Sequence, residues 1–74
     1  MSGRDVVGIL HTFGFEVISQ RGSHIKLRRF GQAGDRETLI IPDHPELDTG
    51  TLRAIVRQAS HYVPLEELQP HFFH

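Results

Sequence analysis

Three side chains in the middle of the sequence, His24, Lys26 and Arg28, have the types and spacing of a site that acts on a phosphodiester. Residues at alternate positions of a strand point to the same face of a sheet. An imidazole exchanges a proton near neutral pH, and an ammonium and a guanidinium both bind phosphate. Such a row can bind a phosphodiester backbone and cut it. The competing interpretation, which these residues alone favour, is the solvated outer face of a half-buried strand.

A strand over residues 24–30 must position these side chains. Ile25 and Leu27 alternate with the three polar residues, so we expect both to enter a core. Gly22 and Ser23 precede the strand and form a tight turn. The backbone N–H groups of this turn are further donors for a bound phosphate.

The charge of the chain is concentrated around this strand. The formal net charge is only −1, which argues against a strongly basic nucleic-acid binder. Residues 21–36, however, hold five Lys and Arg residues against one Asp, and the acidic residues gather in residues 37–74. Because salt screens charges beyond about 10 Å, this partition predicts a local anion site.

Length and composition predict one soluble domain over residues 1–74. The chain has 74 residues, of which 38% are hydrophobic and 23% charged, as in an ordinary globular domain. It has no cysteine, which excludes a disulfide or a thiolate zinc site. No apolar run approaches the roughly 20 residues of a membrane span. The first residues, MSGRD, lack an apolar signal core, so we expect a cytoplasmic protein.

A helix is expected before the central strand, over residues 3–13. Ser2 and Asp5 have the spacing of a capping box, and Gly14 followed by Phe15 is typical of a helix end. The apolar face of this helix is predicted to consist of Val6, Val7, Leu10 and Phe13.

Two further strands are expected to complete an antiparallel meander. The first covers residues 15–20, but its register is ambiguous because Val17 and Ile18 are both apolar and point to opposite faces. The third covers residues 38–41 and follows a polar, glycine-containing hairpin loop at residues 31–36.

A second helix is expected after the loop at residues 42–49, capped by Asp48 or Thr49. Its predicted apolar stripe is Leu52, Ile55, Val56 and Ala59. Pro64 is expected in the first turn of a short helix, and the terminal Phe72 and Phe73 either pack on the core or await a partner. The predicted fold is α+β, with a three-stranded antiparallel sheet covered by helices on one face. The row at His24, Lys26 and Arg28 then lies on the open face.

Three motifs in series resemble one protein family. They are Gly22-Ser23-His24 after a basic residue, Ile41-Pro42-x-His44, and Gly50-Thr51-Leu52-x-x-Ile55-x-x-Gln58-Ala59. With the opening Ser-x-x-Asp helix and the Gly14-Phe15 turn, the chain is similar over about residues 2–69 to the HicA toxins of type II toxin–antitoxin systems. It departs from them at Ser60, where a glycine often stands, in the loop at residues 31–36 and in the Phe72-Phe73 tail.

The resemblance implies a fold like the double-stranded-RNA-binding domain. It also implies a translation-independent endoribonuclease that cuts messenger RNA and arrests growth. A cognate HicB-type antitoxin is implied as the partner that covers the active site. The family's catalytic histidine falls on His24.

The candidate site therefore consists of a catalytic His24 and of Gly22, Ser23, Lys26 and Arg28 as RNA-binding residues, with no metal or cofactor. His44, between two prolines, is the second candidate for catalysis, although a structural role in its loop is favoured. Arg53 and Arg57 contact RNA or form a solvated helix face, and the latter is favoured. Competing functions are a non-catalytic RNA-binding module and a protein-interaction domain that uses the acidic C-terminal half and the phenylalanine-rich tail.

A metal site formed by the histidines near the C-terminus is the least favoured interpretation. His61, His71 and His74 match no compact spacing of metal ligands.

Overall fold

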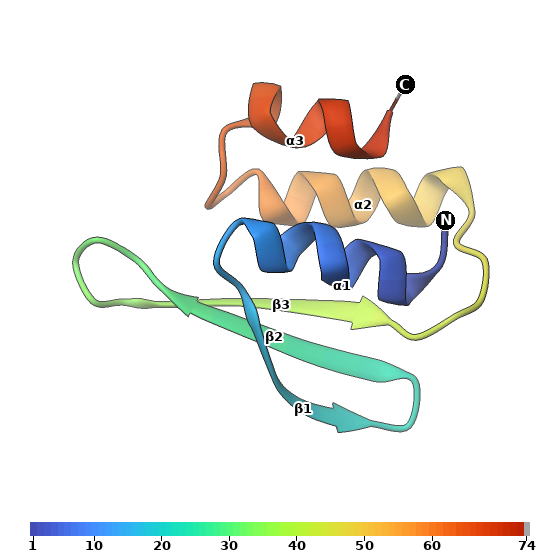
Figure 1. Cartoon of the computed structure of the whole chain (residues 1–74), viewed down its shortest axis with the longest axis horizontal. Coiled ribbons are helices and arrows are strands. Elements are labelled where there is room, and N and C mark those ends of the chain that lie inside the picture. Colours follow the sequence, from blue (N-terminus) through green and yellow to red (C-terminus); the bar gives the residue numbers. More distant parts are fainter. Residues whose placement is uncertain (74) are drawn as a thin grey trace.

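The computed structural model describes residues 1–73, which form three helices and three strands in the order α1-β1-β2-β3-α2-α3 (Figure 1). The elements are α1 (Gly3–Thr12), β1 (Glu16–Arg21), β2 (His24–Phe30), β3 (Arg36–Pro42), α2 (Thr49–Ala59) and α3 (Leu65–Phe72). The strands form one antiparallel sheet in the order β1-β2-β3. The predicted α+β meander is confirmed.

Helix α1 begins and ends close to the predicted positions because both ends carry local signals. The Ser2 hydroxyl accepts a hydrogen bond from the backbone N–H of Asp5, and the Asp5 carboxylate accepts one from the backbone N–H of Ser2. This capping box pairs two N–H groups at the start of the helix. After Gly14 the chain reverses, and the N–H of Phe15 donates to the carbonyl of Leu10. Phe15 is thereby folded back into the core, where it is buried.

A β-bulge resolves the register of β1. Val17 pairs with Leu27 and Ser19 pairs with Lys26, so Ile18 is left without a residue opposite it. An extra residue of this kind bends a strand and changes which side chains share a face. Val17 and Ile18 are consequently both exposed, and β1 contributes no buried residue to the core.

Strand β3 is longer than predicted. The sequence indicates residues 38–41, whereas the pairing with β2 extends from Arg36, opposite Phe30, to Pro42, opposite His24. The polar start of β3, Arg36 and Glu37, therefore joins the sheet through its partners on β2, not through apolar side chains of its own.

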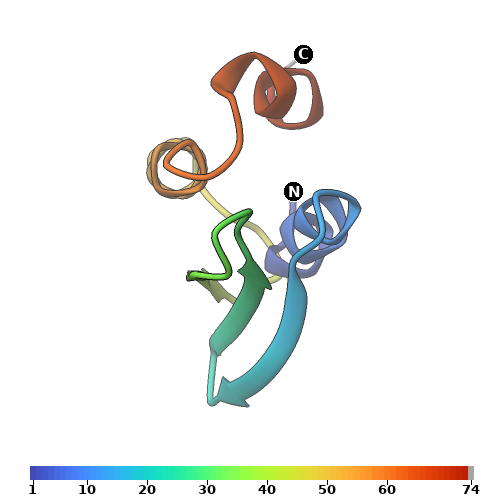
Figure 2. The same ribbon diagram turned by 90° about the vertical axis from the view of Figure 1, so that its left-hand side faces the viewer.

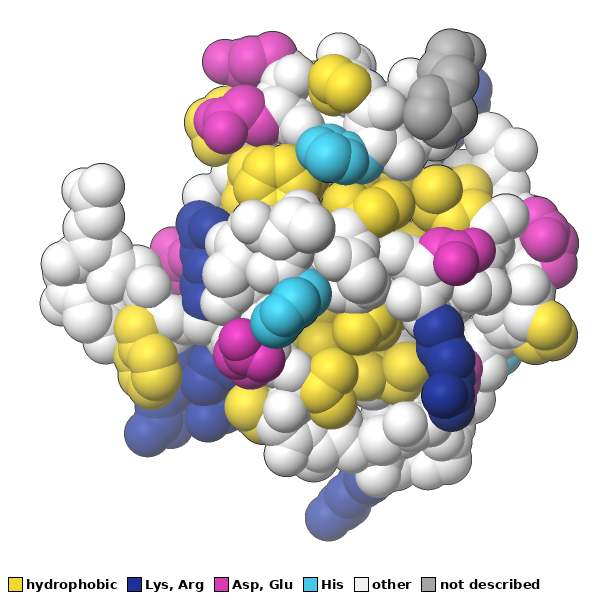
Figure 3. All heavy atoms as spheres, viewed as in Figure 1, with side chains coloured by type: hydrophobic (Ala, Val, Ile, Leu, Met, Phe, Trp, Pro, Cys, Tyr) yellow, Lys and Arg dark blue, Asp and Glu magenta, His cyan; other side chains and the backbone are white. Residues whose placement is uncertain are grey.

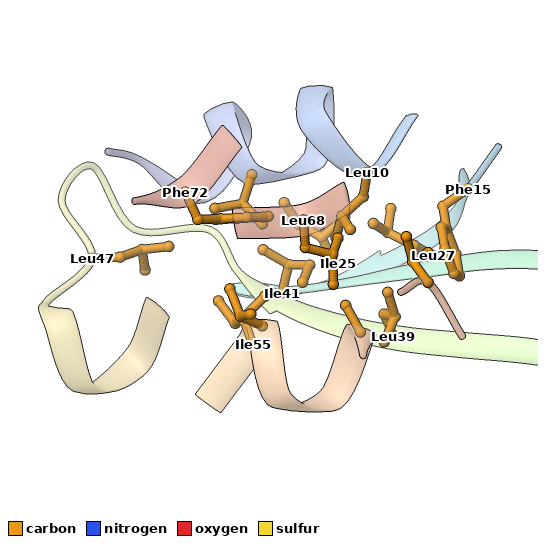
Figure 4. Packing of buried hydrophobic residues seen from close by; sticks show 14 residues of the cluster. Leu10, Phe15, Ile25, Leu27, Leu39, Ile41, Leu47, Ile55, Leu68 and Phe72 are labelled. Carbon is orange, nitrogen blue, oxygen red and sulfur yellow. The ribbon is translucent and has the colours of Figure 1, made fainter. Parts of the chain in front are cut away.

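The hydrophobic core lies between one face of the sheet and the helices (Figure 4). Helices α1 and α2 cover that face, and α3 is the helix farthest from the sheet (Figure 2). The sheet contributes Ile25 and Leu27 from β2 and Leu39 and Ile41 from β3. The opposite face of the sheet is not covered by any helix of residues 1–73.

The C-terminal helices also follow the predicted pattern. The Asp48 carboxylate caps α2 by accepting from the N–H of Thr51 at 2.7 Å. Three members of the predicted stripe of α2, Ile55, Val56 and Ala59, are buried, and Leu52 is half-buried. Phe72, the last residue of α3, packs into the core, while Phe73 directly after the helix is 39% exposed, so the two aromatic residues of the tail have different environments.

Candidate active site on the open sheet face

A two-residue turn places His24 at the start of β2. Arg21 at the end of β1 pairs with His24, and Gly22 and Ser23 connect them. Gly22 has a φ of +54°, in the left-handed region that a residue with a side chain rarely adopts. A positive φ at the first of two turn residues is typical of tight hairpins, in which the strands continue without splaying.

The structure brings the three predicted side chains to one face of β2. His24 is exposed and Lys26 and Arg28 are half-buried, whereas the intervening Ile25 and Leu27 are buried. Successive residues on one face of a strand are roughly 7 Å apart. We call His24, Lys26 and Arg28 the basic row, and its predicted place on the open face is confirmed.

The cations of the basic row have no carboxylate partners within the described chain. Residues 1–73 form four ion pairs, and neither Lys26 nor Arg28 belongs to any of them. On β3, Lys26 lies opposite Ile40 and Arg28 lies opposite Thr38, neither of which carries charge. On β1, Lys26 lies opposite Ser19 and Arg28 lies opposite Glu16, whose carboxylate forms no ion pair with Arg28. The Nε of Arg28 is shielded from solvent and has no hydrogen-bond partner among residues 1–73. The row is therefore a cationic surface whose Lys26 and Arg28 form no ion pair within residues 1–73, with one carboxylate, Glu16, on the strand beside Arg28.

Arg29 belongs to the basic segment of the sequence but not to this surface. It lies on the packed side of β2, where its guanidinium forms an ion pair with Glu37. It also donates to the backbone carbonyls of Phe13 and Tyr62, both at 2.7 Å, and stacks over the ring of Phe15 at 4.8 Å. Arg29 thus joins the ends of α1 and α2 to the sheet, which is a structural role.

A loop that the sequence analysis did not connect with the site supports the turn beside His24. The backbone N–H of Asp43 donates to the carbonyl of Ser23 at 2.7 Å. The Asp43 carboxylate accepts from the Gln20 amide at 2.9 Å and from the Arg4 guanidinium at 3.2 Å. Gln20 donates in addition to the carbonyl of Gly22 at 3.0 Å. These hydrogen bonds fix both ends of the turn from which His24 emerges.

Asp43 is held in its charged form by these contacts. The hydrogen bonds from Arg4, and secondly from Gln20, lower the pKa of the Asp43 carboxyl from its usual 3.8. A charged Asp43 accepts from all of its donors at neutral pH, which keeps the turn in place.

His44 lies in the same loop, and its backbone has a structural function. The carbonyl of His44 accepts a hydrogen bond from the N–H of Gly3 at 2.9 Å, so the loop anchors the start of α1. The side chain of His44 is exposed. Its catalytic role, the second candidate, stays a prediction.

The other histidines lie on the helices or close to their ends. His11 contacts the carbonyl of Phe15 at 3.3 Å, and the ring of His71 packs edge-on against Phe13 at 5.3 Å. His61 lies beside Tyr62, and His74 is outside the described residues. Within residues 1–73, no three His, Asp or Glu side chains are close enough together to hold a metal ion.

Arg53 and Arg57 are exposed on α2. Neither takes part in an ion pair within residues 1–73, and both lie on a different element from the basic row.

The open face offers an accessible imidazole followed by two cations. An imidazole of this kind can remove or supply a proton, and cations beside it can stabilise negative charge that develops on a phosphate. A polyanion lying along β2 would meet all three groups in sequence.

Comparison with known protein families matches residues 3–60 to the family described as HicA toxin of bacterial toxin–antitoxin systems. The matched range contains α1, the whole sheet, α2 and every residue of the candidate site, whereas α3 lies beyond it. No curated protein and no solved structure matches the chain. Within residues 1–73 no helix is long and apolar enough to cross a membrane.

Proposed function

Because this chain belongs to the HicA family of toxins of toxin–antitoxin systems, we propose that it is an endoribonuclease that cuts messenger RNA and arrests growth. The observation that carries the proposal is the exposure of His24 at the head of the basic row on an uncovered sheet face. An accessible imidazole beside unneutralised cations is suited to chemistry on a phosphodiester backbone.

The proposed reaction uses the nucleophile that RNA itself carries, the 2′-hydroxyl. His24 removes the proton of this hydroxyl, whose oxygen attacks the adjacent phosphorus. The bond from phosphorus to the 5′-oxygen of the next nucleotide breaks, which leaves a cyclic 2′,3′-phosphate on one fragment. The departing 5′-oxygen takes up a proton and becomes a hydroxyl. None of the proposed steps uses a metal ion.

The remaining residues of the site bind and stabilise. Lys26 and Arg28 neutralise the charge that develops on the phosphate oxygens in the transition state. The backbone N–H groups at Gly22 and Ser23 add hydrogen bonds to the same phosphate. The basic row contains only one group that readily exchanges a proton, so His24 acts both as base and as acid. One group in two roles predicts slow turnover, which is sufficient for a toxin.

An active ribonuclease in the cytoplasm is lethal, so the proposal includes a partner that closes the site. We propose a HicB-type antitoxin that presents carboxylates or other acceptors to the basic row and competes with RNA for the same cations. In this proposal residues 1–74 act as a single toxin domain.

The alternative function is a non-catalytic RNA-binding module that uses the same face. It is favoured by one observation, that the basic row provides a single proton-transfer group. In that case His24 would only donate a hydrogen bond to RNA.

Induced expression separates the two functions. Wild-type protein should arrest growth and degrade messenger RNA, whereas a folded His24→Ala variant should do neither. His61→Ala, which removes an exposed histidine far along the chain from the turn, is the matched control and should behave as wild type. Growth arrest without RNA cleavage would favour the binding module.

A further inference from the structure

Phe30 is a large apolar side chain in an unusual position. It is the last residue of β2 and is 67% exposed, more than any other large hydrophobic residue of the described chain. Exposing an aromatic side chain of this size to water is unfavourable unless a ligand covers it.

Phe30 continues the basic row. The row occupies alternate positions of β2 from His24 to Arg28, and Phe30 is the next position on the same face. Arg36 lies directly opposite it on β3. Phe30 lies six positions after His24 in the extended strand, at a distance of about 20 Å. The open face thus has an imidazole at one end and an aromatic ring at the other, with cations between them.

A groove lies beside the exposed ring. The pairing of β1 with β2 ends at Arg28, so Phe30 has a neighbouring strand on one side only. A hollow of about 980 Å³ occupies the vacated side. Its lining includes Arg28, Phe30, Ile18 and Tyr62, and also the acidic residues Glu16, Asp35 and Glu37. In Figure 3, hydrophobic and basic side chains adjoin one another at the base of the β2–β3 hairpin, which projects at the left.

The hairpin that follows Phe30 is held by its own backbone. The N–H of Gly31 donates to the carbonyl of Asp35 at 2.8 Å, and the N–H of Gly34 donates to the carbonyl of Gly31 at 2.9 Å. These bonds close the loop directly after Phe30 and hold the backbone at the end of β2 in place.

The charge beside the groove indicates its occupant. Arg28 lines the groove with a guanidinium whose Nε has no hydrogen-bond partner among residues 1–73. Arg36 is likewise absent from the ion pairs of that range. Of the acidic residues in the lining, Glu37 is paired with Arg29, whereas Arg28 and Arg36 have no such partner. An aromatic ring between two cations free of ion pairs matches the way proteins hold single-stranded nucleic acid, with phosphates on the cations and a base on the ring.

We propose that Phe30 and the adjoining groove form a base-stacking subsite for unpaired RNA, several nucleotides from the bond cleaved at His24. This inference rests on the proposed function, because it assigns the RNA that the same face would bind. Only an unpaired base can lie flat on the ring, so the subsite selects single-stranded segments. Phe30 is then a positioning residue that sets the distance between a stacked base and the cleaved phosphodiester.

Binding measurements in the non-cleaving His24→Ala protein test this subsite. The probe is a single-stranded oligouridine with one 2-aminopurine, whose fluorescence is quenched when the base stacks on an aromatic ring. Phe30→Ala should abolish the quenching and weaken binding about 5- to 100-fold. Phe30→Tyr should restore both, and Phe73→Ala, which shortens an exposed phenylalanine just after α3, should change neither. The same probe annealed to its complement should bind equally well with and without the Phe30→Ala substitution.

Three results would overturn the subsite. They are unchanged affinity and quenching in Phe30→Ala, binding by the parent protein without quenching, and a Phe30→Ala defect confined to binding of the antitoxin. Each result is independent of cleavage. If wild-type protein fails to cut RNA, the proposed function fails, whereas failure of the quenching assay alone removes only the subsite.

Discussion

Two adjacent arginines on opposite faces of β2 differ in their hydrogen-bond and ion-pair partners. Arg29 on the packed face is bound by the Glu37 carboxylate and two backbone carbonyls. Arg28 on the open face has no carboxylate partner within residues 1–73, and one of its donors is unpaired. The same side chain thus serves to join elements on one face and is available for a ligand on the other. The number of basic residues in a segment of sequence is therefore only an upper limit to the number of positive charges that are available to a ligand.

The largest expected effect is on stability and distinguishes the two arginines. Arg29→Ala leaves Glu37 and two carbonyls without their donor and should lower the free energy of unfolding by about 2–3 kcal/mol. Arg28→Ala breaks no ion pair and should change it by less than about 0.5 kcal/mol. Urea denaturation of both variants measures the difference. Equal losses would mean that Arg28 also holds the fold together.

For RNA binding, substitutions on the open face of β2 should have the larger effect, the reverse of their effect on stability. Lys26→Ala and Arg28→Ala should each reduce the slope of log affinity against log salt by about 0.7, the value for one contact with a single-stranded phosphate. Arg53→Ala on α2 is the control and should leave the slope unchanged. Titrations at several salt concentrations give these slopes. Unaltered slopes in both β2 variants would place the RNA on another surface.

The proposed antitoxin should also bind the open face of β2 and leave the helices on the packed side uncovered. Because it is proposed to cover the basic row, amide exchange in the complex should be slowed in residues 22–29 relative to the free toxin. Amide exchange in helices α2 and α3, which lie outside the proposed contact with the antitoxin, should be nearly unchanged. Protection confined to residues after Leu52, with residues 22–29 as open as before, would contradict direct occlusion and indicate an inhibitor that acts from the helices.

A smaller effect concerns the support of the turn. Since Arg4 and Gln20 lower the pKa of the Asp43 carboxyl from 3.8, its contacts stabilise the folded state above that pH. The contribution disappears as the pH falls through the lower pKa of the folded state. Asp43→Asn should therefore flatten the acid side of the stability profile. Asp35→Asn in the β2–β3 hairpin is the control, and an identical flattening there would show that the effect is not specific to the turn.

Local signals explain why much of the fold could be predicted. The capping box at Ser2 and Asp5 and the alternation around Ile25 and Leu27 depend on residues close together in the sequence. The bulge at Ile18 could not be predicted, because it depends on how β1 pairs with β2. The start of β3 was missed for the same reason, since the polar Arg36 and Glu37 join the sheet only through partners on β2.

The site shows the same division between local and long-range information. The open-face position of the basic row follows from period-two alternation, so the sequence was sufficient. The inward direction of Arg29 depends on Glu37, Phe13 and Tyr62, which lie on three other parts of the chain. The Asp43 carboxylate that supports the turn accepts from Gln20, which lies 23 positions earlier in the chain, and from Arg4, which lies 39 positions earlier. An acidic residue in a loop after a strand gives no signal of such partners.

The central claim, that the open face acts on RNA through His24, is tested most directly with purified proteins. His24→Ala should keep the wild-type fold and cut single-stranded RNA at least about 100-fold more slowly, because a positioned acid–base group contributes that much or more. Added imidazole should restore part of the rate in His24→Ala and none in a Lys26→Ala variant. A folded His24→Ala protein that cuts RNA at the wild-type rate would contradict the account.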